Sequence, residues 1–276
     1  MLAFEHHVGG EGMTAVPRSA PALLVALLFG LIGPGMAAAQ PVEIDAEIVL
    51  AVDASGSMDP MEREIQRRGY VEALRHPDLM RAVSAGWHGR IALTYFEWAG
   101  QVRPGTVIPW RLIDSPEAAA AMADEIDAIR APTWRGTSIS RAIDFAVDLL
   151  EGSEFAASKR VIDISGDGPN NIGAPVTLSR DRAVANGIVV NGLPVIIRPS
   201  RGVLELDRYF EDCVIGGQGA FVLVVREPQE FAFAIRRKLI LEITGERPER
   251  LRLAADHERV NCLIGEALRQ NMFDRF

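Results

Sequence analysis

The sequence predicts an α/β fold, with a doubly wound, mostly parallel central sheet covered by helices on both faces. Apolar, strand-like runs alternate along the chain with segments whose apolar residues recur at helical spacing. This alternation favours parallel strands joined by crossover helices. The run from Ile44 to Asp53 begins with alternating polarity and ends as a solid apolar block, as expected of a central strand buried on both faces.

The first half of the chain predicts further elements on both sides of this sheet. Asp59 and Pro60 are a capping residue and a helix-opening proline, so a helix begins there. Pro104 and Pro109 place the strand that contains them at a sheet edge, because proline donates no ladder hydrogen bond. The elements predicted in this half are strands over 90–96 and 101–113 and helices over 59–74, 115–129 and 137–150.

The second half continues the alternation to residue 243. Its last helix has Phe231, Ile235, Leu239 and Ile243 in register on one face, the stripe of a helix packed on a core. Residues 246–276 are charged and are predicted to be a peripheral tail attached to a domain over 40–245. The elements predicted in this half are strands over 160–164, 188–197 and 221–225 and helices over 176–186 and 228–243.

Composition limits the function classes. The chain has 276 residues, of which 48% are hydrophobic and 24% charged, and no internal repeat, so we expect one compact domain. Its net charge of −8 argues against a nucleic-acid partner, since such a protein needs a basic surface to neutralise phosphates.

Residues 1–39 have the pattern of a secretory signal peptide. Arg18 precedes an apolar stretch whose unbroken part, Ala22–Ile32, is too short to span a bilayer, and Ala37-Ala38-Ala39 offers a cleavage site. Met13 is a second candidate start, and an uncleaved amino-terminal anchor is the alternative. We expect an exported protein, periplasmic or extracellular, with no membrane span after cleavage.

Cys213 and Cys262 are the two cysteines of the chain. An even number in an oxidising compartment favours a disulfide. The bond would close a loop of about 50 residues and stabilise the fold by roughly 4 kcal/mol. Two free buried thiols are the alternative. The chain has no CxxC motif, so a redox or zinc site has no support.

The segment Asp53-Ala54-Ser55-Gly56-Ser57 lies where the first predicted strand meets the first predicted helix. Ligands of doubly wound sheets bind at the carboxyl ends of the strands. Oxygen side chains at alternate positions of a tight turn can converge on one hard divalent cation. A plain helix amino-terminal cap is the alternative explanation, because Asp and Ser are frequent there.

Two further residues occupy equivalent positions. Thr137 follows Gly136 just before a predicted helix, and Asp167 stands between Gly166 and Gly168 after a predicted strand. With Asp53, Ser55 and Ser57 they would bring hydroxyl and carboxylate oxygens to one edge of the sheet.

This arrangement resembles the metal-ion-dependent adhesion site (MIDAS) of von Willebrand factor A domains. The resemblance covers about 44–243 and implies a Rossmann-like fold. It implies that Ser55, Ser57 and Thr137 offer hydroxyls to the ion, while Asp53 and Asp167 bind it directly or through water. A carboxylate from a protein or peptide partner would fill the sixth position. Mg²⁺ is the expected ion, with Mn²⁺ and Ca²⁺ as alternatives.

The sequence also resembles a narrower group of exported bacterial proteins of this fold that have no assigned function. Ser165-Gly166 departs from the hydrophobic-Thr pair that precedes Asp-Gly in many von Willebrand factor A domains, which puts the shape of that loop in doubt. The matching segments are 88–92, 95–100, 135–140, 165–171 and 212–217.

Four residues are candidates for a partner-binding rim around the ion: Arg135, Glu97, Asn170 and Asn171. Each has an ordinary structural alternative, namely an isolated surface arginine, a solvated carboxylate or a turn.

The function predicted from these residues is metal-dependent binding of a partner, with no catalytic residues. No Gly-x-Ser-x-Gly elbow frames Ser55 or Ser57, and the histidines do not cluster, so a nucleophile has no recognisable base. Two alternatives remain, an exported metal-assisted hydrolase and a structural domain whose metal site is vestigial.

Overall fold

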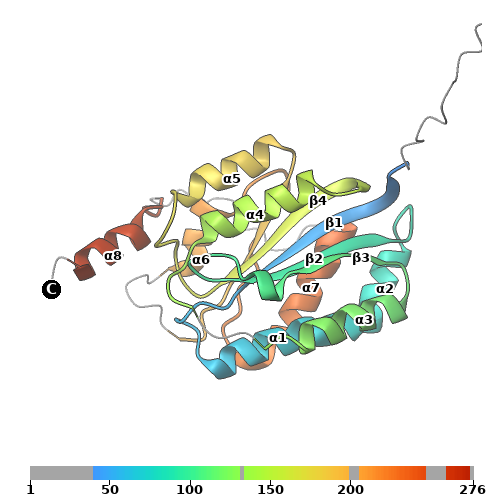
Figure 1. Cartoon of the computed structure of the whole chain (residues 1–276), viewed down its shortest axis with the longest axis horizontal. Helices are drawn as coiled ribbons and strands as arrows, with labels where there is room; N and C mark the ends of the chain where they lie inside the picture. The colour runs from blue at the N-terminus through green and yellow to red at the C-terminus, as the bar shows by residue number, and fades with distance from the viewer. Residues whose placement is uncertain (1–39, 131–133, 199–204, 247–258, 274–276) are drawn as a thin grey trace, which may run out of the picture. The chain divides into compact units, whose positions relative to one another are not determined.

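A computed structural model describes residues 40–130, 134–198, 205–246 and 259–273, and the structural statements below concern these residues. The predicted signal peptide lies outside them. Five strands form one sheet in the order β3-β2-β1-β4-β5, with helices on both of its faces (Figure 1). The strands are β1 (Val42–Asp53), β2 (Ile91–Trp98), β3 (Ile108–Ile113), β4 (Phe155–Gly166) and β5 (Val189–Pro194).

The sheet is parallel except at one edge. β1 pairs in parallel with β2 and β4, and β4 pairs in parallel with β5. β3 is the antiparallel edge strand, which confirms the edge position predicted from Pro109, while Pro104 lies before the strand in a 3₁₀ turn. Asp53 lies opposite Trp98 of β2, and Ala51 lies opposite Ile164 of β4. The carboxyl ends of these three strands therefore meet at one edge of the sheet.

The helices begin where the sequence places their capping residues. At the start of α1, the Asp59 side chain accepts a hydrogen bond from the Glu62 amide, and the Glu62 side chain accepts one from the Asp59 amide, a reciprocal capping box. The α-helices are α1 (Pro60–Arg75), α2 (Pro77–Ser84), α3 (Pro116–Asp127), α4 (Ile139–Glu151), α5 (Val176–Ala185), α6 (Leu206–Tyr209), α7 (Phe231–Thr244) and α8 (Ile264–Phe273). Three shorter turns are η1 (Pro104–Thr106), η2 (Phe210–Val214) and η3 (Pro228–Glu230).

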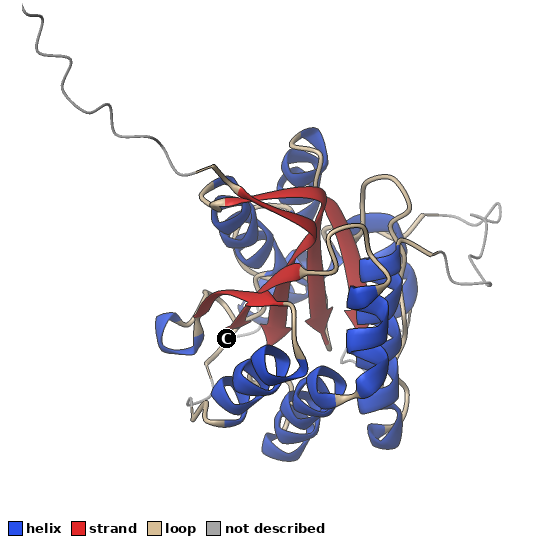
Figure 2. Ribbon diagram, turned by 90° about the vertical axis from the view of Figure 1, so that its right-hand side faces the viewer, coloured by secondary structure: helices blue, strands red, loops and turns tan. Residues whose placement is uncertain are grey.

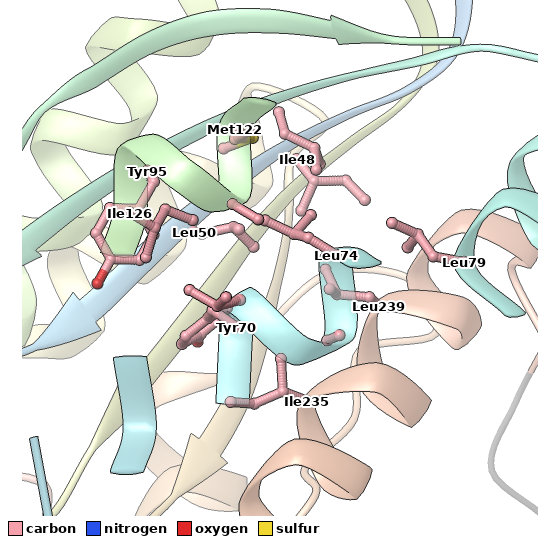
Figure 3. Close-up of a cluster of buried hydrophobic side chains, with 14 of the residues drawn as sticks. Ile48, Leu50, Tyr70, Leu74, Leu79, Tyr95, Met122, Ile126, Ile235 and Leu239 are labelled. Atoms are coloured by element: carbon pink, nitrogen blue, oxygen red, sulfur yellow. The ribbon is translucent and has the colours of Figure 1, made fainter. Parts of the chain in front are cut away.

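The sheet separates two hydrophobic cores. One lies under α1, α2, α3 and α7, and the other under α4, α5, α6 and η2; Figure 2 shows the helices on either side of the strands. In the first core, Tyr70 and Leu74 of α1 and Ile235 of α7 pack over Ile48 and Leu50 of β1 (Figure 3). Burial on both faces explains why β1 is continuously apolar from Ile48 to Val52.

The structure differs from the sequence predictions in the last third of the chain. The strand expected over 221–225 forms only isolated bridges, Gly192 to Val222 and Val195 to Val225. The Phe221 amide instead donates to the Asn191 side chain, which replaces a ladder hydrogen bond. The expected peripheral tail contains a helix, α8. Among the described residues, no helix is long and apolar enough to cross a membrane.

Candidate metal centre

Asp53 ends β1 with its side chain completely buried. Its Oδ1 accepts a hydrogen bond from the Ser55 amide at 2.7 Å, and its Oδ2 accepts one from the Asp167 amide at 3.4 Å. The Gln66 side chain of α1 donates to the Asp53 carbonyl at 2.8 Å. The carboxylate is thus fixed by backbone groups of two loops, and its carbonyl by the first helix.

A chain of side-chain oxygens continues from this residue. The Ser55 and Ser57 hydroxyls lie 2.8 Å apart, and the Ser57 hydroxyl donates to Asp167 Oδ1 at 2.6 Å. Asp167 follows β4, 110 residues after Ser57. The parallel pairing of β1 with β4 therefore brings four of the five predicted ligands into one hydrogen-bonded group.

Thr137, the fifth predicted ligand, arrives on a neighbouring loop. A parallel bridge joins Ser55 to Trp134 at the start of this loop, and Thr137 is 4% exposed. Its amide donates to Asn171 Oδ1 at 3.0 Å, and its carbonyl accepts from the Asn171 amide at 2.9 Å. In the described part of the chain, no hydrogen bond joins the Thr137 hydroxyl to the other four ligands.

Burial makes both carboxylates costly to ionise. Burial raises the pKa of Asp53 to about 8, and the nearby charge of Asp167 raises it further. Burial also raises the pKa of Asp167 to about 6, although a hydrogen bond from a serine hydroxyl opposes the shift. Arg198, whose charge also lowers the pKa of Asp167, forms its ion pairs with Asp59 and Glu62. A buried carboxylate, Asp53, and a half-buried one, Asp167, without an ion pair from a described Lys, Arg or His make a place where a bound cation is favourable.

The donor atoms suit a hard ion. All five side chains offer oxygen, the donor that Mg²⁺, Mn²⁺ and Ca²⁺ prefer. Among the described residues, no group of three or more His, Cys, Asp or Glu is arranged to hold a metal. Any ion at this edge would therefore depend on the serine and threonine hydroxyls as well as on the two carboxylates.

The structure does not place all four candidate rim residues on the surface. Arg135 is exposed and Asn171 is partly exposed. Glu97 is only 2% exposed, because it lies between Arg67, at 2.7 Å, and Arg103, at 3.5 Å. Glu97 is thus part of a buried ion-pair cluster and does not line an exposed rim.

Asn170 is also fully buried. Its Oδ1 accepts from the Ser140 amide at 3.0 Å, and its Nδ2 donates to Glu266 of α8 at 2.7 Å. Its own amide donates to the Tyr209 hydroxyl at 3.1 Å. Asn170 therefore joins three parts of the chain and is not free to contact a partner.

Sequence reasoning missed residues of α1 that border the site. Glu62 and Gln66 are one helical turn apart, and both are at least nine-tenths buried. Gln66 holds the Asp53 carbonyl, and Glu62 pairs with Arg198 at 2.5 Å. The Asp-x-x-Glu capping pattern and the i, i+4 spacing were the signals that could have identified this face.

The two cysteines form a disulfide with Cα atoms 5.5 Å apart, which confirms that prediction. Cys213 lies in η2 and is buried, and Cys262 precedes α8. The bond attaches the carboxyl-terminal segment to the body of the domain.

Comparison with known families gives one match over most of the chain. The profile of a family described as "Protein of unknown function (DUF1194)" matches residues 43–247. No curated protein matches the sequence significantly.

Solved structures share the fold at low identity. Proximal thread matrix protein 1 from the mussel byssus has a TM-score of 0.55 and 14% identity over 75% of this chain and 50% of its own. A von Willebrand factor type A protein from Catenulispora acidiphila has a TM-score of 0.53 and 14% identity over 73% of this chain and 43% of its own. The pilus adhesin SpaC from Lactobacillus rhamnosus GG has a TM-score of 0.53 and 12% identity over 73% of this chain and 31% of its own.

This chain thus spans half or less of the length of these three proteins. At such identities the similarity shows the fold, which is that of von Willebrand factor A domains. One structure of the mussel protein is described as having a zinc-occupied MIDAS motif.

Proposed function

The chain belongs to the DUF1194 family and has a von Willebrand factor A-type fold, and we propose that it is an exported binding module. It holds one divalent cation at the carboxyl edge of its sheet and uses that cation to bind a partner. The ion would supply a positive charge with an open coordination position, to which a carboxylate of a protein or peptide binds.

One observation carries this proposal. Asp53 and Asp167 are joined through Ser55 and Ser57 in a continuous chain of hydrogen bonds, and no described basic side chain forms an ion pair with either carboxylate. Desolvated carboxylates need a counter-charge. The zinc-occupied MIDAS of the mussel protein supports a divalent cation at the corresponding edge of this fold.

The proposed ligands have distinct contributions. Ser55, Ser57 and Thr137 offer neutral hydroxyls, and Asp53 and Asp167 bring the negative charge, directly or through water. These two anionic and three neutral donors fill five of the six coordination positions of a bound divalent ion, so one position stays open for an anionic ligand. Mg²⁺ fits this small, all-oxygen set, and Mn²⁺ and Ca²⁺ are the competing ions to be compared.

Export is the second part of the proposal. The amino-terminal sequence has the pattern of a signal peptide, and Cys213 and Cys262 form a disulfide, which persists in oxidising compartments. The mussel byssus protein and the pilus adhesin are named for structures outside the cell. We propose a periplasmic or extracellular location on these grounds.

Calorimetric titration of metal-stripped protein with Mg²⁺, Mn²⁺ and Ca²⁺ tests the metal site. We expect one-site binding, lost in folded Asp53→Ala and Thr137→Ala proteins. Asp181→Ala is the matched control, because this aspartate is exposed and its ion pair is with its neighbour Arg180. Binding that survives in folded Asp53→Ala protein would contradict the proposal.

The alternatives give different results in the same experiment. A vestigial site predicts a folded wild-type protein that takes up no ion. A metal-assisted hydrolase predicts ion binding together with turnover of ester or phosphate substrates. Ion binding without turnover, followed by metal-dependent capture of carboxylate-bearing peptides, is the result that we expect.

A further inference from the structure

The carboxyl-terminal segment reaches the loops around the candidate metal centre. α8 lies beyond residues 43–247, the part that matches the family profile. Nevertheless Glu266 of α8 accepts a hydrogen bond at 2.7 Å from Nδ2 of the buried Asn170. The same Nδ2 also donates to the Ala174 carbonyl at 3.1 Å. The helix is therefore bonded directly to the loop that follows Asp167.

The residue next to Asn170 holds Thr137. Asn171 accepts from the Thr137 amide at 3.0 Å, and the Thr137 carbonyl accepts from the amides of Asn171 and Ile172 at 2.9 and 3.2 Å. The Ser138 hydroxyl donates to the Ile172 carbonyl at 2.8 Å. The loop over 170–172 therefore sets where the backbone of Thr137 lies.

Close packing reinforces this contact. Gly136 has a φ of +86°, and a Cβ added there would overlap the Ile172 side chain. A side chain at 136 would be strained at this φ and would have to displace the Ile172 side chain. The two loops thus hold one another in a single relative position.

α8 supports this pair of loops from the other side. A Cβ added at Gly265 would overlap the Asn170 carbonyl oxygen, so the helix backbone rests directly against Asn170. The segment is held there by the Cys213–Cys262 disulfide and by the Val260 amide, which donates to Asp212 at 2.9 Å.

From these contacts we propose that Glu266 is a positioning residue for the metal centre. Held by the disulfide, α8 fixes Asn170, Asn171 then fixes Thr137, and the Thr137 hydroxyl is thereby kept ready for the ion. The inference rests on the proposed function, since it concerns the same ion. Reduction of the disulfide would release α8 and weaken metal binding without touching a ligand.

A matched pair of variants tests the contact. Glu266→Gln keeps a side-chain oxygen that accepts from Asn170, whereas Glu266→Leu removes it. We expect Glu266→Leu to weaken Mg²⁺ binding about tenfold, the usual scale for loss of a group that orients a ligand, and Glu266→Gln to restore affinity to within about twofold. Gln270→Leu, at an exposed position of α8, is the control and should bind like wild type.

Hydrogen exchange distinguishes positioning from general damage. In the metal-free protein, Glu266→Leu should speed exchange of the Thr137 amide, which is bonded to Asn171. The Ser55 amide, bonded to Asp53, should keep its wild-type rate. Equal acceleration at both amides would show general loosening and overturn the inference. Glu266→Ala, which removes the carboxylate without introducing a branched apolar side chain, provides the same readouts if Glu266→Leu does not fold.

The outcomes separate this inference from the proposed function. A folded wild-type protein that binds no ion would overturn the proposed function. Ion binding with wild-type affinity in Glu266→Leu protein would overturn the inference alone. The double variant Cys213→Ser, Cys262→Ser should weaken Mg²⁺ binding in the same direction as Glu266→Leu, and unchanged affinity would exclude a contribution of the disulfide.

Discussion

Two pairs of carboxylates lie against the same sheet, one pair fully buried and the other, Asp53 and Asp167, buried and half-buried, and their surroundings differ. Asp163 of β4 and Glu242 of α7 lie beside Lys238, whose ammonium is 2.7 Å from the first and 2.5 Å from the second. Asp53 and Asp167, at the carboxyl edge, are instead surrounded by hydroxyls and backbone amides. The first cluster contains its own cation, and among the described residues the second does not.

The difference separates a structural cluster from a binding site. Lys238, Asp163 and Glu242 are all at least 96% buried, and Asn191 donates to Glu242 at 2.9 Å, so the cation of this cluster comes from the fold itself. In the proposed function, an ion from solution meets the same electrostatic need at the carboxyl edge. The predictions below test this contrast, beginning with the largest expected effect.

Removing the internal cation should be the most damaging change. Lys238→Met leaves Asp163 and Glu242 buried without a counter-charge and should lower the free energy of unfolding by about 3–5 kcal/mol. Urea denaturation measures the change. Lys159→Met is the control, since Lys159 is partly exposed and its Nζ donates to the Ile243 carbonyl; it should cost about 1 kcal/mol. Equal losses in the free energy of unfolding for the two variants would contradict the proposed difference between the two clusters.

Adding the external cation should stabilise the other cluster. At a Mg²⁺ concentration about 100 times the dissociation constant, the free energy of unfolding should rise by about 2.7 kcal/mol, because only the folded chain binds the ion. Denaturation with and without the metal measures this gain. Asp53→Asn protein should gain nothing, and a gain as large as that of wild type would show that the ion binds elsewhere.

The internal cluster should respond to pH. Burial raises the pKa of Glu242 to about 7, and the charge of Asp163 adds to the shift while Lys238 opposes it. A carboxyl group with a raised pKa binds its proton more tightly when folded. Its contribution to stability is therefore complete below its ordinary pKa of 4.5 and is lost as pH rises through 7.

In metal-free buffer, wild type should therefore lose about 2 kcal/mol more than Glu242→Gln between about pH 5 and pH 8. Chemical denaturation at each pH gives the two slopes. Parallel curves for the two proteins would show that Glu242 does not titrate in this range.

The smallest expected effect is the change in the free energy of unfolding caused by an Asp→Asn substitution, which should have opposite signs at the two clusters. At about pH 9 and without metal, Asp53→Asn removes one of two unpaired charges and should raise the free energy of unfolding by about 1 kcal/mol. Asp163→Asn takes a partner from Lys238 and should lower it. Two losses of similar size in denaturation experiments would mean that a cation of the chain already compensates Asp53.

Much of the fold could be predicted because its signals are local. Three such signals each span a few residues, and the structure confirms what they predict. They are the apolar run of β1, Pro109 of β3 and the Asp59-Pro60 start of α1. The parallel sheet then brings Ser57 and Asp167 together, as expected for side chains that follow neighbouring strands.

The errors concern polar residues whose surroundings come from distant segments. Glu97 is buried because Arg67 and Arg103 meet it there, and Asn170 is buried because α8 covers it. The 228–243 segment shows an apolar stripe, but Lys238 on the same helix is fully buried beside Asp163. Apart from Glu242, which lies one helical turn after Lys238, nothing within a few residues of these positions indicates such partners.

The amino-acid order was enough to predict the succession of strands and helices, the pairing of the two cysteines and the oxygen-rich turn after β1, because each follows from periodicity, capping or count. Which charges are compensated within the chain became clear only from the folded arrangement. Compensation depends on which side chains from different elements meet, as Asp163 of β4 and Lys238 of α7 do, and burial then decides how strongly each charge needs its partner.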